Sequence, residues 1–165
     1  MTPPDASSLV MRPAVPQDLN ALLAIDNLCF PPGIAYPRHE IAILLRAPAV
    51  VTIAALLPQG IVGFASMGFK QLRHLAQMQL RAELITIDVL PEFRRLHVGW
   101  RLHQALEEQC RIQNGKNIAL HVAVENAAAI AFYQGLDYRV VERVPHYYLD
   151  SIDAWRMEKS LSDAK

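Results

Sequence analysis

The sequence predicts an α/β protein whose mixed sheet carries helices on both faces, and three observations support this prediction. Apolar runs of strand length recur along the 165 residues, and patterns with the period of a helix lie between several of them. Their order, β-α-α-β-β-β-α-β-α-β-β, interleaves the two kinds of element. A composition of 52% hydrophobic residues is enough to fill a core between a sheet and its covering helices.

The first half of the chain is expected to hold four strands and two helices. Strands are expected at 9–12, 50–57, 61–69 and 82–90, and helices at 16–28 and 38–46. Residues 30–37 hold three prolines and a glycine, which are typical of a surface loop. The triplet Pro58-Gln59-Gly60 between two apolar runs indicates a hairpin. Residues 70–81 are expected to form a loop or irregular extension, because polar residues crowd between their apolar ones.

The second half is expected to hold two helices and three strands. Helix 98–113 should end near Asn114-Gly115, because asparagine and glycine at a helix end readily take the left-handed conformation. Strand 117–124 lacks strict alternation, so both of its faces should be covered. Asn126 is expected to cap the following helix, 127–134. The last two strands are expected at 138–144 and 154–160.

Length and composition favour a single domain at residues 8–165 after a disordered tail at 1–7. Lys plus Arg and Asp plus Glu both total 16, so the formal net charge is zero and no nucleic-acid partner or membrane surface is expected. Cys29 and Cys110 lack the spacing of a metal site, so no metal is expected and each is interpreted as a small buried hydrophobe. The N-terminus lacks the features of a signal peptide, which makes a cytoplasmic location the default expectation.

The segment around residues 84–100 carries the clearest functional signal. An apolar, β-branched run leads into a turn with Arg94 and Arg95, and a helical pattern then begins at Val98. The first backbone N–H groups of a helix have no partner within the helix, and together with the helix dipole they bind phosphate oxygens. Because the two arginines lie where such a phosphate would bind, the segment predicts a phosphate-bearing cofactor.

The order strand, Arg-x-x-x-x-Gly, helix, followed by Asn126 and Tyr133, resembles the GNAT acetyltransferase superfamily. The resemblance runs from Leu9 to Leu161 and is closest to protein N-terminal acetyltransferases, both the bacterial ribosomal-protein type and the eukaryotic type. The segments that carry the narrower match are Cys29-Phe30-Pro31-Pro32, Leu120-His121-Val122, the run 126–133, His146-Tyr147-Tyr148 and Asp153-Ala154-Trp155-Arg156-Met157. The resemblance implies a mostly antiparallel sheet of about seven strands that splays in the middle. We expect a monomer or a homodimer.

Acetyl-CoA is the cofactor that the resemblance implies, with its pyrophosphate on the loop before helix 98–113. The family pattern there is Gln/Arg-x-x-Gly-x-Gly/Ala, and His97 stands where the family usually has its first glycine. In the family, the strand that carries Val89 diverges from its neighbour and the thioester lies in the gap, where N–H groups near Val89 and Leu90 would polarise the carbonyl. The implied cofactor-binding residues are Val89, Leu90, Arg94, Arg95, Leu96, His97, Val98, Gly99, Trp100, Asn126 and Tyr133.

Acetyl transfer to an amine needs an acceptor for the amine proton and a donor for the leaving sulfur. By its match to the family tyrosine, Tyr133 is the candidate acid, because a tyrosine with a pKa of about 10 is protonated at neutral pH. His121 is the candidate base, since histidine side chains in general exchange protons near neutral pH. Glu83 is a second candidate that would work with His121 through water. Strand alternation places Glu83 on one face with Ile85, Ile87 and Val89, and places Asp88 on the opposite face, outside the site.

Simpler interpretations of these residues stay open. Tyr133 could be a core aromatic, His121 a buried histidine bonded to a backbone carbonyl, and Glu83 a solvated strand-end residue. Phe30, Tyr36, Tyr147 and Tyr148 come from two loops that should flank the amine entrance, and the four aromatic side chains are candidate substrate-binding residues.

The predicted function is an N-acetyltransferase that moves the acetyl group of acetyl-CoA to a protein or peptide N-terminal α-amine by direct attack in a ternary complex. One alternative is a small amine, a polyamine or a lysine side chain as the acceptor. Another is a degenerate acyl-CoA-binding module without catalysis, because His97 and the absence of the glutamate usual at position 121 of the bacterial relatives both depart from the family pattern.

Overall fold

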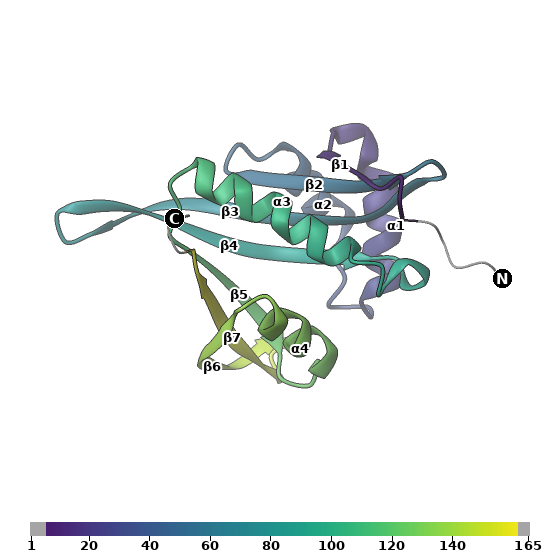
Figure 1. The fold of residues 1–165 in the computed structure, drawn as a ribbon. Helices are drawn as coiled ribbons and strands as arrows, with labels where there is room; N and C mark the ends of the chain where they lie inside the picture. The colour runs from purple at the N-terminus through teal and green to yellow at the C-terminus, as the bar shows by residue number, and fades with distance from the viewer. Residues whose placement is uncertain (1–5, 162–165) are drawn as a thin grey trace. The chain divides into compact units, whose positions relative to one another are not determined.

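The computed structural model describes residues 6–161, which form the elements drawn in Figure 1. The expected tail at 1–7 lies outside the described residues apart from Ala6 and Ser7. The strands are β1 Val10–Pro13, β2 Val50–Leu57, β3 Gly60–His74, β4 Gln77–Val89, β5 Asn117–Ala123, β6 Arg139–Tyr148 and β7 Ile152–Ser160. The helices are α1 Leu19–Cys29, α2 Arg38–Arg46, α3 Val98–Ile112 and α4 Ala127–Gly135, with short 3-10 turns at Pro16–Asp18 and Pro91–Phe93.

The seven strands follow the order β1-β2-β3-β4-β5-β7-β6. The pairs β1/β2, β2/β3, β5/β7 and β6/β7 are antiparallel. Strands β4 and β5 are parallel, and their register joins Ala82 to Ile118 and Glu83 to Ala119. The mixed, mostly antiparallel α/β sheet that the sequence predicts is therefore confirmed.

The chain divides into two compact units. Unit 1 comprises Met1–Gly68 and Ile85–Gln109, and unit 2 comprises Phe69–Leu84 and Cys110–Lys165. The expectation of a single domain over residues 8–165 stays a prediction. In the part of the chain that the structure describes, no helix is long and apolar enough to cross a membrane.

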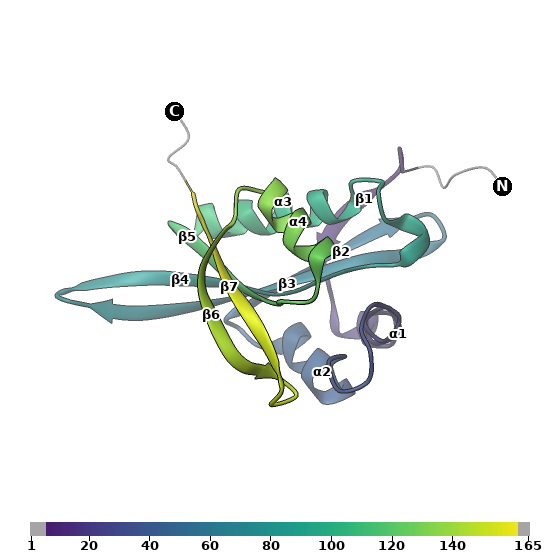
Figure 2. The ribbon, with the colours of Figure 1, turned by 90° about the horizontal axis from the view of Figure 1, so that it is seen from below.

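Unit 1 is a sheet segment with helices on both faces. Helices α1 and α2 lie on one side of its strands and α3 lies on the other (Figure 2). Leu22 and Ile25 of α1 pack with Ile41 and Leu44 of α2 against Phe64 of β3, and all five are buried. Gly63 lies so close to β4 that a Cβ atom there would be 2.7 Å from the carbonyl oxygen of Asp88, which explains a glycine in this strand.

Unit 2 contains β5, β6, β7 and α4. The buried side chains of Ile118 and Leu120 on β5 pair across the ladder with Lys159 and Met157 of β7. Helix α4 begins where it was expected, because the Asn126 side chain accepts a hydrogen bond from the N–H group of Ala129 at 3.1 Å. These elements carry the side chains around His121.

Two expectations for the strands are wrong. Residues 70–81 are not a loop, because β3 runs on to His74 and β4 begins at Gln77. The two strands leave both faces of this hairpin largely exposed, so no buried face imposes the alternation by which a strand is recognised. Strand β6 extends to Tyr148, so Tyr147 and Tyr148 lie at the end of a strand and not in a loop.

Candidate functional site

His121 is the centre of a side-chain cluster in unit 2. Its Nδ1 lies 3.2 Å from Oε1 of Glu83. Glu83 pairs with Ala119 in the β4–β5 register, and His121 follows two residues later on the same face of β5, so the register brings the two side chains together. The expectation that a water molecule lies between them is wrong, because their hydrogen bond is direct. The His121 side chain is 15% exposed and the Glu83 side chain 42%, so the pair is open to solvent on the carboxylate side.

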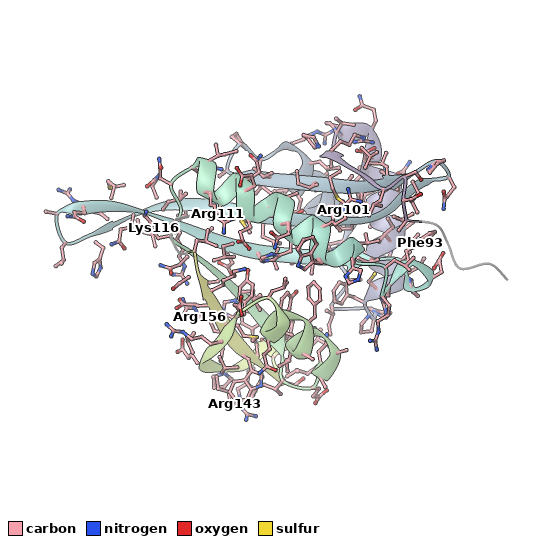
Figure 3. All side chains as sticks on the ribbon, viewed as in Figure 1. Phe93, Arg101, Arg111, Lys116, Arg143 and Arg156 are labelled. Carbon is pink, nitrogen blue, oxygen red and sulfur yellow. The ribbon has the colours of Figure 1, made fainter. Side chains whose placement is uncertain are left out.

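The charge on Glu83 decides which nitrogen of His121 carries hydrogen. The hydrogen bond from His121 holds the pKa of the Glu83 carboxyl below its ordinary value, and the positive charges of Arg81 and Arg156 add to this against the effect of burial. Arg156 extends from β7 of the same unit (Figure 3). An ionised carboxylate only accepts hydrogen bonds, so Nδ1 must be the donor and the lone pair remains on Nε2. A neutral imidazole in this tautomer can accept a proton at Nε2.

Tyr147 and Tyr148 complete the His121 cluster. The Tyr147 ring stacks on the imidazole with centroids 4.3 Å apart and an interplanar angle of 8°. The Tyr148 hydroxyl donates a hydrogen bond to the carbonyl oxygen of His121 at 3.2 Å. Burial raises the pKa of Tyr148 to about 12 and also raises the pKa of Tyr147, so both hydroxyls keep their protons at neutral pH. The two expected aromatic residues therefore contact the expected base.

Asp153 of β7 holds the end of β6, a role that the sequence did not indicate. One carboxylate oxygen accepts the backbone N–H of His146 at 3.0 Å, and the other accepts Nε of Arg143 at 2.8 Å. His146 has a φ of 53°, in the left-handed region, directly before the two tyrosines. The carboxylate thus stabilises the irregular turn of the backbone that presents Tyr147 and Tyr148. Asp153 lay within a segment of the family resemblance, but no spacing pattern assigns it this role.

Tyr133 on α4 is buried and packs against two neighbouring aromatic rings. It is 8% exposed, and its ring meets those of Phe132 and Tyr138 edge-on at 5.4 and 5.7 Å. Its role as the acid stays a prediction. Asn126, seven residues earlier, has its cap role confirmed, whereas its contact with the pantetheine arm stays a prediction.

The segment before α3 in unit 1 has the geometry of an anion site. Arg95 and His97 have φ values of 65° and 58°, so the loop alternates left-handed residues with ordinary ones. The first intrahelical hydrogen bond runs from the N–H of Arg101 to the carbonyl oxygen of His97 at 2.9 Å. The three preceding N–H groups of the helix, at Val98, Gly99 and Trp100, therefore lack intrahelical acceptors. These donors fit the diphosphate of acetyl-CoA, and the φ of His97 explains why a glycine usually stands at this position.

The contacts of Leu90 and Arg94, which follow β4, differ from expectation. The N–H of Leu90 donates to the carbonyl oxygen of Val62 at 2.9 Å, so it does not serve as the donor that polarises the acetyl carbonyl. Arg94 donates from Nε to the carbonyl oxygen of Val89 at 3.1 Å and from Nη2 to Sγ of Cys29 at 3.6 Å. Arg94 is thus anchored to the protein, and Cys29 is a half-buried hydrogen-bonding group instead of a buried hydrophobe.

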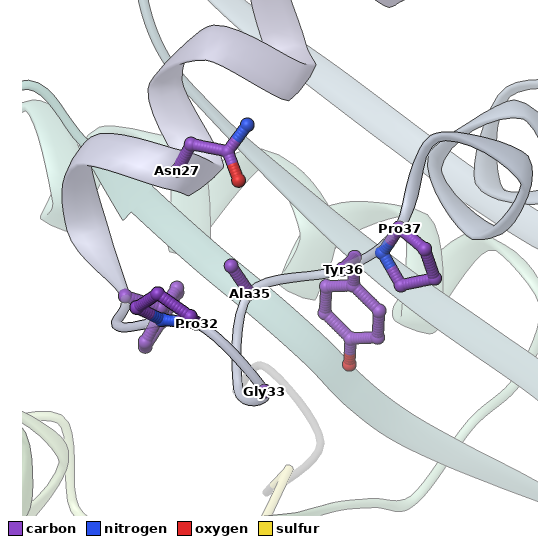
Figure 4. Close-up of a pocket in the computed structure, with 7 residues that line it drawn as sticks. Asn27, Pro32, Gly33, Ala35, Tyr36 and Pro37 are labelled. Atoms are coloured by element: carbon purple, nitrogen blue, oxygen red, sulfur yellow. The ribbon is translucent and has the colours of Figure 1, made fainter.

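An open pocket of about 630 Å³ lies in the loop between α1 and α2 (Figure 4). It contains both expected aromatic residues of this loop. The lining residues are Asn27, Phe30, Pro32, Gly33, Ala35, Tyr36 and Pro37. The Tyr36 hydroxyl donates to the carbonyl oxygen of Ile85 on β4 at 3.5 Å, and the backbone N–H of Tyr36 donates to Asp26 at 2.6 Å. The loop that carries the pocket is therefore fastened on both sides of Tyr36.

Comparison with known proteins places this geometry in context. Residues 19–138 match the model of the acetyltransferase (GNAT) family. An N-alpha-acetyltransferase of Sulfurisphaera tokodaii is 28% identical over 149 residues, covering 87% of this chain and 88% of the relative.

Two solved structures share the fold. Arabidopsis thaliana NAA60 in complex with acetyl-CoA has a TM-score of 0.82 at 20% identity, covering 94% of this chain and 99% of that one. The ribosomal-protein-S18-alanine N-acetyltransferase of Escherichia coli has a TM-score of 0.76 at 22% identity, covering 95% and 96%.

Proposed function

The chain belongs to the acetyltransferase (GNAT) family, and from this premise we propose that it acetylates the N-terminal α-amine of a protein or peptide. As a member of the family it is an acetyl-CoA-dependent N-acetyltransferase. The finer assignment to α-amines is supported by relatives that are N-alpha-acetyltransferases and cover most of the chain. Acetyl-CoA supplies the acetyl group as a thioester, which an amine can attack directly.

The observation that carries the proposal is the His121 cluster. A neutral amine is needed for attack, and Nε2 of His121 has the lone pair that accepts the proton the amine loses. The Glu83 carboxylate, bonded to Nδ1 at 3.2 Å, fixes this tautomer and stabilises the positive charge that develops on the imidazole. Tyr147 holds the plane of the ring by stacking, and Tyr148 bonds the His121 backbone.

The remaining roles are assigned by resemblance and by the geometry of unit 1. Tyr133 donates a proton to the sulfur that leaves as the new C–N bond forms and the C–S bond breaks. The N–H groups of Val98, Gly99 and Trp100, together with Arg95, bind the cofactor phosphates. Phe30 and Tyr36 line the pocket that receives the first side chains of the peptide.

The test is thiol release from acetyl-CoA with three matched acceptors. One is a short lysine-free peptide with a free α-amine, the second is the same peptide N-formylated and carrying one lysine, and the third is spermidine. We expect release with the first acceptor alone. Release with the lysine peptide or spermidine instead would move the assignment to side-chain or polyamine acetylation. Binding of acetyl-CoA with no release for any acceptor would support a module without catalysis.

A further inference from the structure

Two acidic residues lie buried in unit 1 and have no part in the roles assigned above. Asp26 on α1 is 0% exposed and Asp88 on β4 is 1% exposed. Burial of ionised carboxylates costs several kcal/mol unless they are paired or protonated, so an apolar residue would be the simpler choice at either place. The presence of two such acids in one unit suggests that the hydrogen bonds they make have a structural role.

The contacts of this acid pair form a chain from β4 to the pocket loop. The Thr86 hydroxyl donates to Oδ1 of Asp88 at 2.6 Å. The Asp88 and Asp26 carboxyls each act on the pKa of the other, which places them near one another. Oδ2 of Asp26 then accepts the backbone N–H of Tyr36 at 2.6 Å. Within residues 6–161, Asp26 Oδ1 and Asp88 Oδ2 are buried and have no hydrogen-bond partner. One proton shared between the two carboxyls would satisfy both oxygens.

The surroundings of the acid pair favour that proton. Burial raises the pKa of both carboxyls, that of Asp88 the further, and the negative charge of Asp26 adds to the rise at Asp88. The charged or titratable groups that act on the pair are Arg94, whose positive charge opposes the rise in the pKa of Asp88, and the Cys29 thiol, whose own pKa is raised by burial and by the charge of Asp88. One positive charge faces two carboxyls, so a single negative charge is the state that these neighbours balance.

We propose that Asp26 and Asp88 are positioning residues that hold the pocket loop, residues 30–37, against the end of β4 through one shared proton. The loop has two fastenings to the rest of unit 1 near Tyr36, and the shorter of them is the bond to Asp26. Loss of the shared proton places two like charges side by side and drives α1 and β4 apart at this point. The part of this inference that concerns acceptor binding rests on the proposed function, in which the pocket binds the peptide.

The sign of the pH effect follows from the raised pKa values. The folded state keeps the proton at pH values where the unfolded chain has already lost it. The stabilisation from the shared proton is therefore complete below the ordinary pKa of a carboxyl group, falls as the pH rises above it, and is lost above the raised pKa of the folded state. The pocket loop should therefore loosen at alkaline pH. Acetyl-CoA binding, which uses the segment before α3, should not follow this loosening.

The experiment measures amide hydrogen exchange of residues 30–37 from about pH 5 to about pH 9, corrected for the intrinsic pH dependence of exchange. The variants are Asp88→Asn, whose amide donates to Asp26 without a titratable proton, and Asp18→Asn as a matched control. Asp18 is also a buried acid of unit 1, but it pairs with Arg12 at 2.7 Å. We expect the protection of the loop to fall about tenfold with rising pH in wild type and Asp18→Asn, and to stay constant in Asp88→Asn.

Two further readouts separate this inference from the proposed function. The KM for the peptide should rise about tenfold with pH in wild type while the Kd for acetyl-CoA stays unchanged, and Asp88→Asn should abolish the rise. Infrared spectroscopy should detect a protonated carboxyl in wild type that Asp88→Asn lacks. Constant loop protection in wild type, or no protonated carboxyl, would overturn the inference. If the protection of the loop depends on pH and on Asp88 as expected, but the protein acetylates no peptide, the role of the acid pair in holding the loop stands. Only the assignment of the peptide as acceptor is then rejected.

Discussion

In unit 1 the acids Asp26 and Asp88 are buried and each acts on the pKa of the other, whereas in unit 2 the acid Glu83 is half-exposed and bonded to a histidine. Burial raises the pKa of the first two, and the hydrogen bond from His121 lowers that of the third. The same functional group thus holds a proton in the proposal for unit 1 and is the ionised partner of a histidine in unit 2. Solvent access and the neighbouring hydrogen-bond donor therefore decide the protonation state of a carboxyl group more than its residue type does.

The largest expected effect tests whether unit 2 carries the proton chemistry. His121→Ala should lower kcat by about 10²- to 10⁴-fold, because the amine then loses its proton acceptor. The inflection that a histidine base produces in the pH–rate profile should disappear with it. Steady-state kinetics over pH with the peptide acceptor make the measurement, and His74→Ala on the exposed β3–β4 hairpin is the control. An inflection that survives the substitution would make His121 structural.

Removal of the proposed acid should have the next largest effect. Tyr133→Phe should lower kcat on the order of 10²-fold and leave the Kd for acetyl-CoA nearly unchanged, because only the hydroxyl that protonates the sulfur is lost. Tyr138→Phe, on a buried ring that contacts Tyr133 edge-on, is the matched control. Calorimetry measures the Kd for acetyl-CoA, and thiol release measures kcat. A large loss of affinity at constant kcat would instead assign Tyr133 to cofactor binding.

Glu83→Gln tests the half-exposed carboxylate itself. The loss of a hydrogen bond to a charged group is worth about 1.5–3 kcal/mol, which corresponds to a drop in kcat of about 10- to 100-fold. Because the pKa of Glu83 is lowered, the ionised carboxylate makes its full contribution above the ordinary pKa of a carboxyl group. This contribution is lost as the pH falls through the lowered pKa. The acid limb of the kcat profile should therefore flatten in the variant. An unchanged acid limb would show that Glu83 is merely solvated.

The smallest expected effect concerns the backbone site of unit 1. His97→Gly should raise the free energy of unfolding by about 1 kcal/mol, since a residue with a Cβ is strained at a φ of 58°. The melting temperature should then rise by about 2–4 °C, and the Kd for acetyl-CoA should fall. His146→Gly, at a φ of 53° outside the phosphate loop, should give the stability gain without the gain in affinity. Weaker binding in His97→Gly would show that the imidazole contacts the cofactor.

Elements with a buried face could be predicted from the sequence. Helix α2 and strand β2 lie within the expected limits, 38–46 and 50–57. The apolar residues of α2 repeat with the period of a helix, and β2 is an apolar run of strand length. The exposed β3–β4 hairpin was missed for the opposite reason.

Local sequence was enough to indicate the family, the use of acetyl-CoA and most of the candidate site residues. The strand–arginine–helix segment, the tyrosine pair and His121 follow from local pattern and resemblance, since these motifs consist of neighbouring residues. Tertiary structure alone decided the partners. Glu83 meets His121 through the register of two strands, the N–H of Leu90 is used by Val62, and Asp88, set aside as facing away from the site, meets Asp26 from 62 positions earlier. Such pairs depend on long-range register and on burial, which no local pattern in the chain encodes.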